Sequence, residues 1–171
     1  FTAVEPALRA LRADALVAVA ESPTEIALVP AGPRTRLGVL FQPGARVDPR
    51  AYAAVLRPLA EAGHVVVIVK QPLGIAFLST SALDAARREY PDVARWVVGG
   101  HSLGGTVAAM EADGADAAPT APVVGLLLFA SYPAGDISTS LDAAVLSVSG
   151  GKDGLATPAK IEASRATLPA G

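Results

Sequence analysis

The sequence has no cysteine among its 171 residues, which excludes disulfide bonds, thiolate metal sites and a cysteine nucleophile. Histidine occurs only at His64 and His101. A metal centre built from several histidines is therefore not expected, and no metal or other cofactor is predicted. Aromatic residues make up only 5% of the chain. The core must therefore be built mainly from Ala, Val, Leu and Ile.

Charge of neither sign predominates, because 14 Lys and Arg face 16 Asp and Glu, for a net charge of −2. No basic excess indicates a nucleic-acid partner, and no acidic run indicates a disordered tail. The longest apolar run, residues 122–130, is far shorter than the roughly 20 residues that cross a bilayer and has the length of a buried strand. A content of 51% hydrophobic residues predicts one domain, residues 1–171, with a single core.

Short β-type runs alternate with alanine-rich helical stretches. This pattern predicts an α/β fold with a mostly parallel, doubly wound sheet and helices on both faces. Strands without polar alternation are expected to be buried on both sides. Predicted strands are 25–29, 36–41, 65–70, 96–99, 123–130 and 144–149; predicted helices are 8–19, 48–62, 82–90, 103–113 and 157–167.

Residues 99–105 read GGHSLGG and contain the pattern Gly100-x-Ser102-x-Gly104. A predicted strand leads into this pattern and a predicted helix leads out of it, which is the context of a nucleophile elbow. So sharp a turn strains the serine backbone and holds its hydroxyl out at the sheet edge, while the glycines leave room for close packing. The helix N-terminus favours a developing oxyanion. Ser102 is therefore the predicted nucleophile. The alternative is a glycine-rich turn of another doubly wound fold, although it matches neither a P-loop nor a dinucleotide turn.

Such a serine needs an acid and a base, in the chain order Ser, acid, His. Asp153 follows the predicted strand 144–149, which places it on the same sheet edge as Ser102, where open α/β sheets bind ligands. It is the predicted acid, and a turn aspartate without a catalytic role is the alternative. Asp136 is the second choice, and Asp142 ranks below it.

Neither histidine is expected to be the base. His64 lies between a predicted helix and a predicted strand, and so at the opposite sheet edge. His101 is next to the nucleophile in sequence and is expected to pack beneath the turn. A base would follow one more strand after the helix 157–167, beyond Gly171. We therefore expect the C-terminal strand and helix of the fold to be missing from this chain.

The oxyanion formed during attack on a carbonyl needs two backbone N–H donors. One is predicted at Leu103, directly after the nucleophile, and the other in the loop that follows the strand 36–41. In that loop Pro43 has no N–H and Gly44 permits a turn, so the N–H of Ala45 is the second predicted donor. A plain loop is the alternative.

Four blocks occur in order along the chain: LFQPGARVDPRAY at 40–52, VKQPLGIAF at 69–77, GGHSLGG at 99–105 and ASYP at 130–133. With these blocks the chain resembles the small bacterial α/β-hydrolase family, close to its dienelactone-hydrolase branch, from about Thr24 onward. The resemblance implies an α/β-hydrolase fold, Ser102 as nucleophile, Asp153 as acid, and a histidine in a Gly-Gly-Asn-His-like context further on. Similar proteins often carry an N-terminal anchor helix. The resemblance therefore suggests an extracytoplasmic protein, anchored in a membrane through a segment that is not in this chain.

The short segment 131–143 between two predicted strands leaves no room for a lid domain, so the pocket is expected to be shallow and open. Small carboxylic esters or lactones fit such a pocket better than long lipids do. Pro72, Leu73 and Tyr132 are candidates for lining it, together with Pro133, although each is equally expected as a packing residue.

The predicted function is cleavage of a small-molecule ester through an acyl-enzyme on Ser102. One alternative is a catalytically silent fragment or binding scaffold, because the base is missing; a C-terminal fragment of the same protein would then be its partner. Another alternative keeps the chemistry and changes the acceptor, as in an acyltransferase or a serine peptidase.

Overall fold

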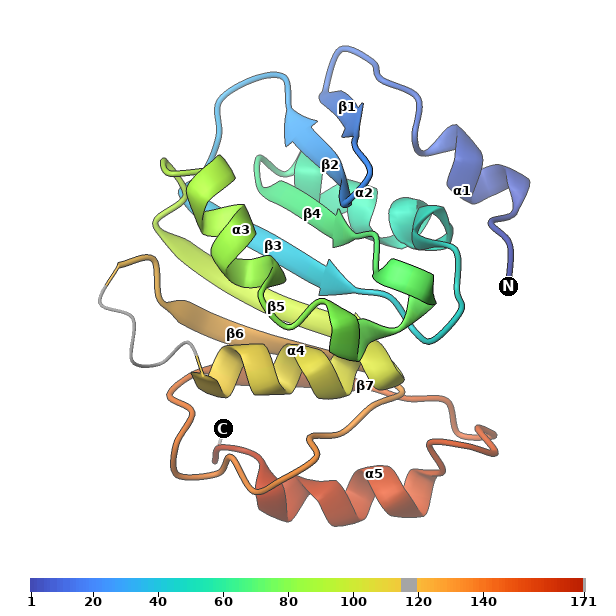
Figure 1. Ribbon diagram of the computed structural model, residues 1–171, viewed down its shortest axis with the longest axis vertical. Coiled ribbons are helices and arrows are strands. Elements are labelled where there is room, and N and C mark those ends of the chain that lie inside the picture. The colour runs from blue at the N-terminus through green and yellow to red at the C-terminus, as the bar shows by residue number, and fades with distance from the viewer. Residues whose placement is uncertain (115–119, 171) are drawn as a thin grey trace.

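The computed structural model describes residues 1–114 and 120–170, in which seven strands form one sheet (Figure 1). The strands are β1 (Val17–Glu21), β2 (Glu25–Pro30), β3 (Leu37–Gln42), β4 (Val65–Val69), β5 (Arg95–His101), β6 (Val123–Phe129) and β7 (Ala144–Val148). Their order is β1-β2-β4-β3-β5-β6-β7. The pairings from β4 to β7 are parallel, whereas β2 pairs antiparallel with both β1 and β4. The predicted mostly parallel sheet is thus confirmed.

The strands β2 to β6 are covered on both faces, as their apolar sequences predict, whereas most residues of β7 are exposed. In β4, Val66 and Ile68 pack with Leu56 of α2, whereas Val67 packs on the opposite face with Ala108 of α4. Figure 1 shows α3 and α4 in front of the sheet and α2 behind it. The α-helices are α1 (Glu5–Arg9), α2 (Ala53–Glu61), α3 (Ala82–Glu89), α4 (Leu103–Gly114) and α5 (Pro158–Ser164); 3-10 turns are η1 (Pro49–Tyr52), η2 (Pro72–Gly74), η3 (Ala76–Leu78) and η5 (Arg165–Thr167).

Two helix starts follow from local chemistry. Asp48 caps the first by accepting a hydrogen bond from Arg50 N at 3.0 Å, and Pro49 stands at the first position. This segment begins as the turn η1 and continues into α2. Thr157 caps α5 in the same way, with Lys160 N donating to Thr157 Oγ1 at 3.4 Å. An acceptor side chain followed by proline is a strong start signal for a helix, and both starts were predicted.

The predicted helix 8–19 is wrong. The chain forms only α1 there and then turns at Asp14, whose Oδ1 accepts hydrogen bonds from Leu16 N and Val17 N. From Val17 it enters β1, which pairs with β2 over its whole length. Val17 is completely buried in this arrangement. Burial and pairing with a neighbouring strand therefore outweigh the local helix preference of an alanine-rich segment.

The connection between β6 and β7, residues 130–143, contains no helix or strand, so no lid domain stands there, as predicted. β7 is the last strand of the sheet and pairs only with β6 among the described residues. Its Leu146 and Val148 are 61% and 49% exposed. Within residues 1–114 and 120–170 no helix is both long and apolar enough to cross a membrane.

Candidate active site

Ser102 lies at the sharp turn between β5 and α4, and its side chain is exposed. Its φ of 51° is in the left-handed region, which is strained for a residue other than glycine. The turn is held on both sides, because Ser102 N donates to Phe129 O at 2.9 Å and Ser131 Oγ donates to Ser102 O at 2.7 Å. The structure thus places the serine hydroxyl at the carboxyl edge of the sheet.

Backbone strain gathers at this edge. Among the described residues, the non-glycine residues with positive φ are Arg46, Leu73, Ser102, Ala121 and Ala130. All except Ala121 follow the carboxyl ends of successive parallel strands, β3, β4, β5 and β6. Strained residues of this kind concentrate at functional sites, where the surrounding structure holds them in place. The strain therefore points independently to the edge that the serine motif indicated.

The glycines beside Ser102 permit the close approach of α4 to the sheet. A Cβ on Gly100 would collide with the backbone of Gly104, and a Cβ on Gly104 would collide with the carbonyl oxygens of Gln42 and Pro43. These obstacles are backbone atoms, which cannot rotate away. Only glycine therefore lets the start of α4 lie directly against the end of β3.

Replacing Gly104 with Ala is expected to lower the free energy of unfolding by about 3 kcal/mol, because α4 must move away from β3 to admit the methyl group. Gly114→Ala is the matched control, since Gly114 ends the same helix and a Cβ there meets nothing within 4 Å. That control should be neutral or stabilising by up to about 1 kcal/mol. Urea unfolding of the two variants measures the difference, and equal stabilities would contradict the steric argument.

The loop after β3, residues 43–47 (the β3 loop), leaves one N–H group without a partner. Pro43 has no N–H. The other donors are Gly44 N to Tyr52 Oη at 2.9 Å, Arg46 N to Gly74 O at 2.9 Å and Val47 N to Gly44 O at 3.1 Å. Ala45 N and Leu103 N donate to no atom within the described part of the chain. Because Gly104 touches Gln42 and Pro43, these two free N–H groups stand on adjoining segments at the same edge.

Asp153 lies in the loop between β7 and α5 and is partly exposed. Its Oδ1 accepts hydrogen bonds from Leu155 N at 2.8 Å and Ala156 N at 3.0 Å, which fixes the carboxylate in its loop. Its charge acts on His101, the neighbour of Ser102. Asp153 therefore lies on the Ser102 side of the molecule, as predicted from the strand order.

Asp136, the second choice for the acid, is exposed in the β6–β7 connection. Its Oδ1 accepts a hydrogen bond from Ser138 N at 2.9 Å, and its hydrogen bonds with Ser138 lower its pKa. Asp142 is also exposed. Nothing in the structure connects either carboxylate with Ser102.

His101 is held beneath the turn by Tyr52. Tyr52 Oη accepts a hydrogen bond from Gly44 N at 2.9 Å and lies within hydrogen-bond distance of His101 Nδ1, at 2.8 Å. Burial lowers the pKa of His101, and the charge of Asp153 opposes that shift. No hydrogen bond joins a ring nitrogen of His101 to Ser102 Oγ among the described residues.

His64, the other histidine, directly precedes β4, so it stands at the amino edge of the sheet. Its Nδ1 lies 2.7 Å from Thr35 Oγ1. Neither histidine makes a hydrogen bond to Ser102 within the part of the chain that the structure describes.

The lowered pKa of His101 gives stability a pH dependence. The ordinary pKa of a histidine is about 6.5. Below that pH the unfolded chain binds a proton at His101 that the folded chain does not yet bind. The free energy of unfolding therefore falls as the pH drops from 6.5 through the lowered pKa of the folded state. We expect His101→Asn to lose less stability than the wild type between about pH 7.5 and about pH 5.5. Urea titrations at the two pH values test this, with His64→Asn as control. An equal loss in wild type and His101→Asn would contradict the prediction.

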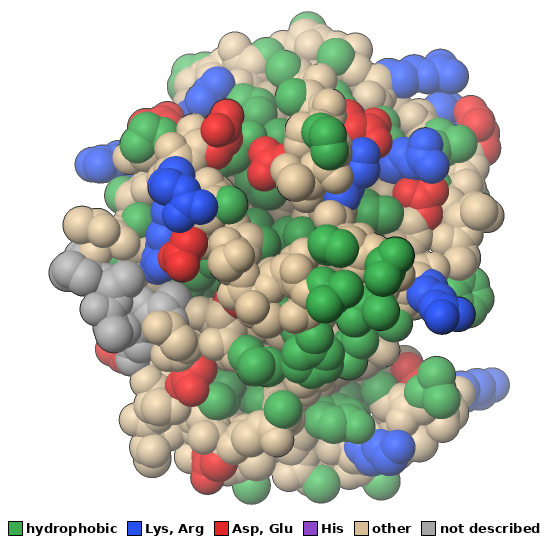
Figure 2. Space-filling view, in the orientation of Figure 1, with side chains coloured by type: hydrophobic (Ala, Val, Ile, Leu, Met, Phe, Trp, Pro, Cys, Tyr) green, Lys and Arg blue, Asp and Glu red, His purple; other side chains and the backbone are tan. Residues whose placement is uncertain are grey.

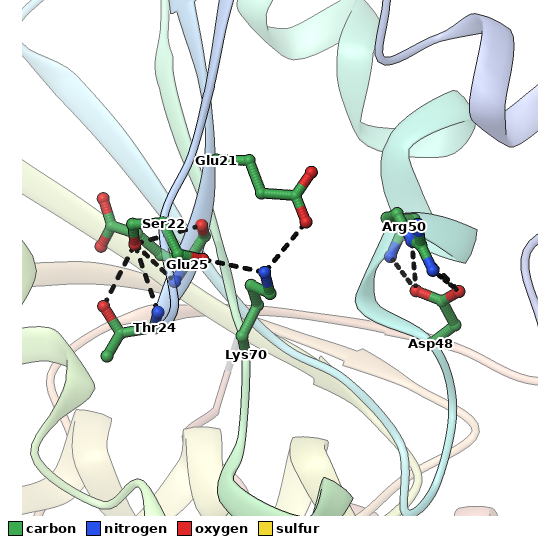
Figure 3. A network of polar contacts seen from close by, with 7 residues as sticks. All are labelled: Glu21, Ser22, Thr24, Glu25, Asp48, Arg50 and Lys70. Carbon is green, nitrogen blue, oxygen red and sulfur yellow. Dashed lines mark hydrogen bonds and ion pairs between the residues drawn. The ribbon is translucent and has the colours of Figure 1, made fainter.

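A cavity of about 840 Å³ opens on this part of the molecule, and Ser102 is not among its lining residues. It lies at the carboxyl end of β4 on the α3 side, with Val67 and Val69 in its floor and Ala82 and Ala85 of α3 in its wall. Part of its rim is polar. Lys70 Nζ donates to Glu21 Oε1 at 2.9 Å and to Ser22 O at 2.8 Å, and Asp48 pairs with Arg50 nearby (Figure 3).

The three candidate lining residues fall in two places. Pro72 and Leu73 line the large cavity. Tyr132 is not among its lining residues and lies beside the turn, because Thr106 Oγ1 in the first turn of α4 donates to Tyr132 O at 3.0 Å. Figure 2 shows hydrophobic side chains gathered over the region where η2, η3 and the start of α4 lie. The exposed apolar residues there include Leu73 and Phe77, at 83% and 46%.

Several supporting residues escaped the sequence reasoning. Ser131 and Tyr52 belong to the quoted blocks, but their hydrogen bonds to the turn and to the β3 loop are contacts between distant segments. Glu111 is buried in α4. An acidic residue within a largely apolar helix was the signal that could have drawn attention to it, because a buried carboxylate needs partners. No three His, Asp or Glu residues of the described chain gather closely enough to hold a metal ion.

Comparison with known families is decisive for the fold. A model of the alpha/beta hydrolase family matches residues 38–171. The chain belongs to the alpha/beta hydrolase family. The resemblance noted in the sequence is thereby confirmed, as is the predicted alpha/beta hydrolase fold.

Solved structures share this alpha/beta hydrolase fold at low sequence identity. A bacterial heroin esterase is 21% identical, with a TM-score of 0.55, and the match covers 71% of this chain and 45% of that one. A Pyrobaculum calidifontis esterase is 20% identical, with a TM-score of 0.58 and coverages of 79% and 50%. TT1662 from Thermus thermophilus is 16% identical, with a TM-score of 0.64 and coverages of 91% and 85%.

The chain thus spans about half the length of these two esterases. No curated protein matches it in sequence.

Proposed function

We propose that this chain is the part of a serine hydrolase that contains the nucleophile, Ser102. The enzyme cleaves small carboxylic esters or lactones through an acyl-enzyme on that serine. The observation that carries the proposal is the exposed Ser102 in a left-handed turn between β5 and α4, with two free N–H groups on adjoining segments. Membership of the alpha/beta hydrolase family and the fold shared with esterases support it.

In the proposed reaction, Ser102 Oγ attacks the carbonyl carbon of the ester while its proton passes to a base. The N–H groups of Leu103 and Ala45 hold the oxyanion of the tetrahedral intermediate, and each such donor contributes about 3–4 kcal/mol to lowering the barrier. The intermediate collapses, and the alcohol leaves with the proton from the base. Water then attacks the acyl-serine by the same steps in reverse, which releases the acid and restores Ser102.

The base in this scheme is a histidine outside the 171 residues, because neither His64 nor His101 makes a hydrogen bond to Ser102 among the described residues. Asp153 orients that histidine and stabilises its charged form. Its Oδ1 is held by two backbone N–H groups, whereas its Oδ2 receives no hydrogen bond from any described residue. We also propose that the protein is extracytoplasmic and anchored through a segment outside this chain.

Small substrates are proposed because the β6–β7 connection is short and holds no helix that could cover Ser102. An open site of this kind gives little burial to a long acyl chain. The exposed apolar residues around η2 and η3 offer a limited contact for a short acyl or alcohol group. Two of the compared structures are esterases, which agrees with an ester substrate.

The test is hydrolysis of p-nitrophenyl acetate by the full-length protein, together with labelling by a fluorophosphonate that reacts with activated serines. We expect turnover and a covalent adduct on the tryptic peptide that contains Ser102. Labelling of a different serine would overturn the assignment. Transfer of the acyl group to an added alcohol or amine, or cleavage of a peptide, would indicate an acyltransferase or a serine peptidase.

A second candidate function is a catalytically silent scaffold, with a C-terminal fragment of the same protein as its partner. One observation favours it: among the described residues, neither His64 nor His101 makes a hydrogen bond to Ser102. The mass of the intact protein isolated from its source distinguishes the two. A mass of 17.2 kDa with no turnover supports the scaffold, whereas a larger mass with turnover supports the hydrolase.

A further inference from the structure

A chain of buried side chains connects helix α4 with the β3 loop. Gln42, completely buried at the end of β3, donates from Nε2 to Glu111 Oε2 at 2.8 Å and to Ser79 O at 3.0 Å. Gln71 donates from its own Nε2 to Gln42 Oε1 at 2.9 Å and to Pro43 O at 3.0 Å. Glu111 is thus connected through two glutamines to the peptide that begins the β3 loop.

The direction of this network is fixed by its acceptors. Turning the Gln42 amide would point its oxygen at the Glu111 carboxylate, so the amide N–H groups must face Glu111. The Gln42 oxygen is then left to accept from Gln71. Gln71 Oε1 is itself buried and has no partner among the described residues. Gln71 therefore makes both of its hydrogen bonds through its N–H groups and leaves its carbonyl oxygen unpaired within the described part of the chain. A buried polar atom without a partner is uncommon in proteins and needs a specific explanation.

Glu111 makes the network part of the same rigid unit as the nucleophile turn. It is 7% exposed and lies on α4, whose first residue is Leu103. Its Oε1 also accepts from Leu83 N at 3.0 Å. Burial raises the pKa of Glu111, and the hydrogen bond from Gln42 opposes that shift. One helix thus carries the Leu103 N–H at its start and the anchor of the β3 loop in its third turn.

We propose that Glu111, Gln42 and Gln71 are positioning residues that fix the Pro43 peptide, and through it the Ala45 N–H, beside the Leu103 N–H. The inference rests on the proposed hydrolase function, in which these two N–H groups bind the oxyanion. None of the three side chains touches the substrate. Because the oxyanion exists only in and near the transition state, losing the network lowers kcat and leaves KM almost unchanged.

Gln71→Glu is the sharpest test, because it keeps the shape of the side chain and replaces its donor with an acceptor facing Gln42 Oε1 and Pro43 O. Deleting an oxyanion donor costs roughly 100- to 1,000-fold in kcat. A displaced donor should cost about 10- to 100-fold in p-nitrophenyl acetate hydrolysis, with KM within about twofold of wild type. Gln71→Met, which has neither donor nor acceptor at that place, should lie between wild type and Gln71→Glu. If Gln71 served only to fill space, kcat would not decrease in the order wild type, Gln71→Met, Gln71→Glu.

Glu111→Gln tests the other end, because its amide nitrogen must face either Gln42 Nε2 or Leu83 N. We expect a fall in kcat similar to that of Gln71→Met. Ile68→Val is the stability control, since Ile68 is a completely buried residue of β4 on the opposite face. It should lower the unfolding midpoint in urea without changing kcat. If Gln71→Glu, or Gln71→Met should the former not fold, keeps kcat within twofold of wild type, the positioning role is overturned.

A backbone measurement separates this inference from the proposed function. If the wild type shows no turnover and no labelling, the hydrolase proposal fails. The network can still be detected through the amide resonance of Ala45 in a 15N spectrum. Gln71→Glu should shift that resonance more than Ile68→Val does. An unmoved Ala45 resonance would overturn the network by itself, whatever the enzyme assay shows.

Discussion

Ser102→Ala is expected to reduce the hydrolysis of p-nitrophenyl acetate by the full-length protein about 10,000-fold or more, because it removes the atom that forms the acyl-enzyme. The effect should fall on kcat and on fluorophosphonate labelling together. Folding should be preserved, since the turn is held by backbone hydrogen bonds to Phe129 and from Ser131 that an alanine at position 102 also makes.

Ser149→Ala is the control for the nucleophile. Ser149 is an exposed serine directly after β7, and it should keep full activity. The measurement is the initial rate at saturating ester, corrected for the spontaneous rate. Turnover retained by Ser102→Ala would remove the chemical basis of the proposed function, although the alpha/beta hydrolase fold would stand.

Asp153→Asn is expected to lower kcat about 10,000-fold, because an amide cannot hold a histidine in the tautomer that accepts the serine proton, nor stabilise its charged form. Asparagine is close in shape to aspartate. Its Oδ1 can still accept from Leu155 N and Ala156 N, so the loop should keep its structure. A loss of activity without a loss of stability would therefore report on catalysis.

Asp136→Asn is the matched control for the acid. Asp136 also accepts a hydrogen bond from a backbone N–H two residues ahead, that of Ser138. Its replacement should change kcat by less than about twofold if Asp153 is the acid. The opposite result, a large loss at Asp136 and none at Asp153, would transfer the role to the β6–β7 connection. Steady-state kinetics of both variants with one ester decides between them.

The parts of the fold that the sequence predicted best are those with strong local signals. Asp48-Pro49 and Thr157-Pro158 start helices where predicted, because an N-cap acceptor and a proline act within one turn. The buried strand Val65–Val69 was predicted from its unbroken apolar run. The segment 8–19 failed because its alanines favour a helix locally, whereas pairing with β2 and the burial of Val17 decide for a strand.

The candidate site also has some features that the sequence predicts and others that it does not. The exposed Ser102 turn and the edge on which Asp153 lies could be predicted, because a strand–serine–helix motif and the order of parallel strands fix them. The roles of Ala45 and of the lining residues depend on which N–H groups are already used and on where loops meet. Of the lining residues, Pro72 and Leu73 line a cavity that Ser102 does not share, and no local pattern indicates that separation.

The alpha/beta hydrolase class, the strained serine and the carboxylate that follows β7 can all be predicted from the sequence, because short-range sterics and strand order encode them. The contact of His101 with Tyr52, and the path from Glu111 to the β3 loop through Gln42 and Gln71, arise only when the chain is folded. Those contacts join residues 28 to 69 positions apart. They depend on how α4 packs against β3, and the spacing of residues along the chain carries no information about that.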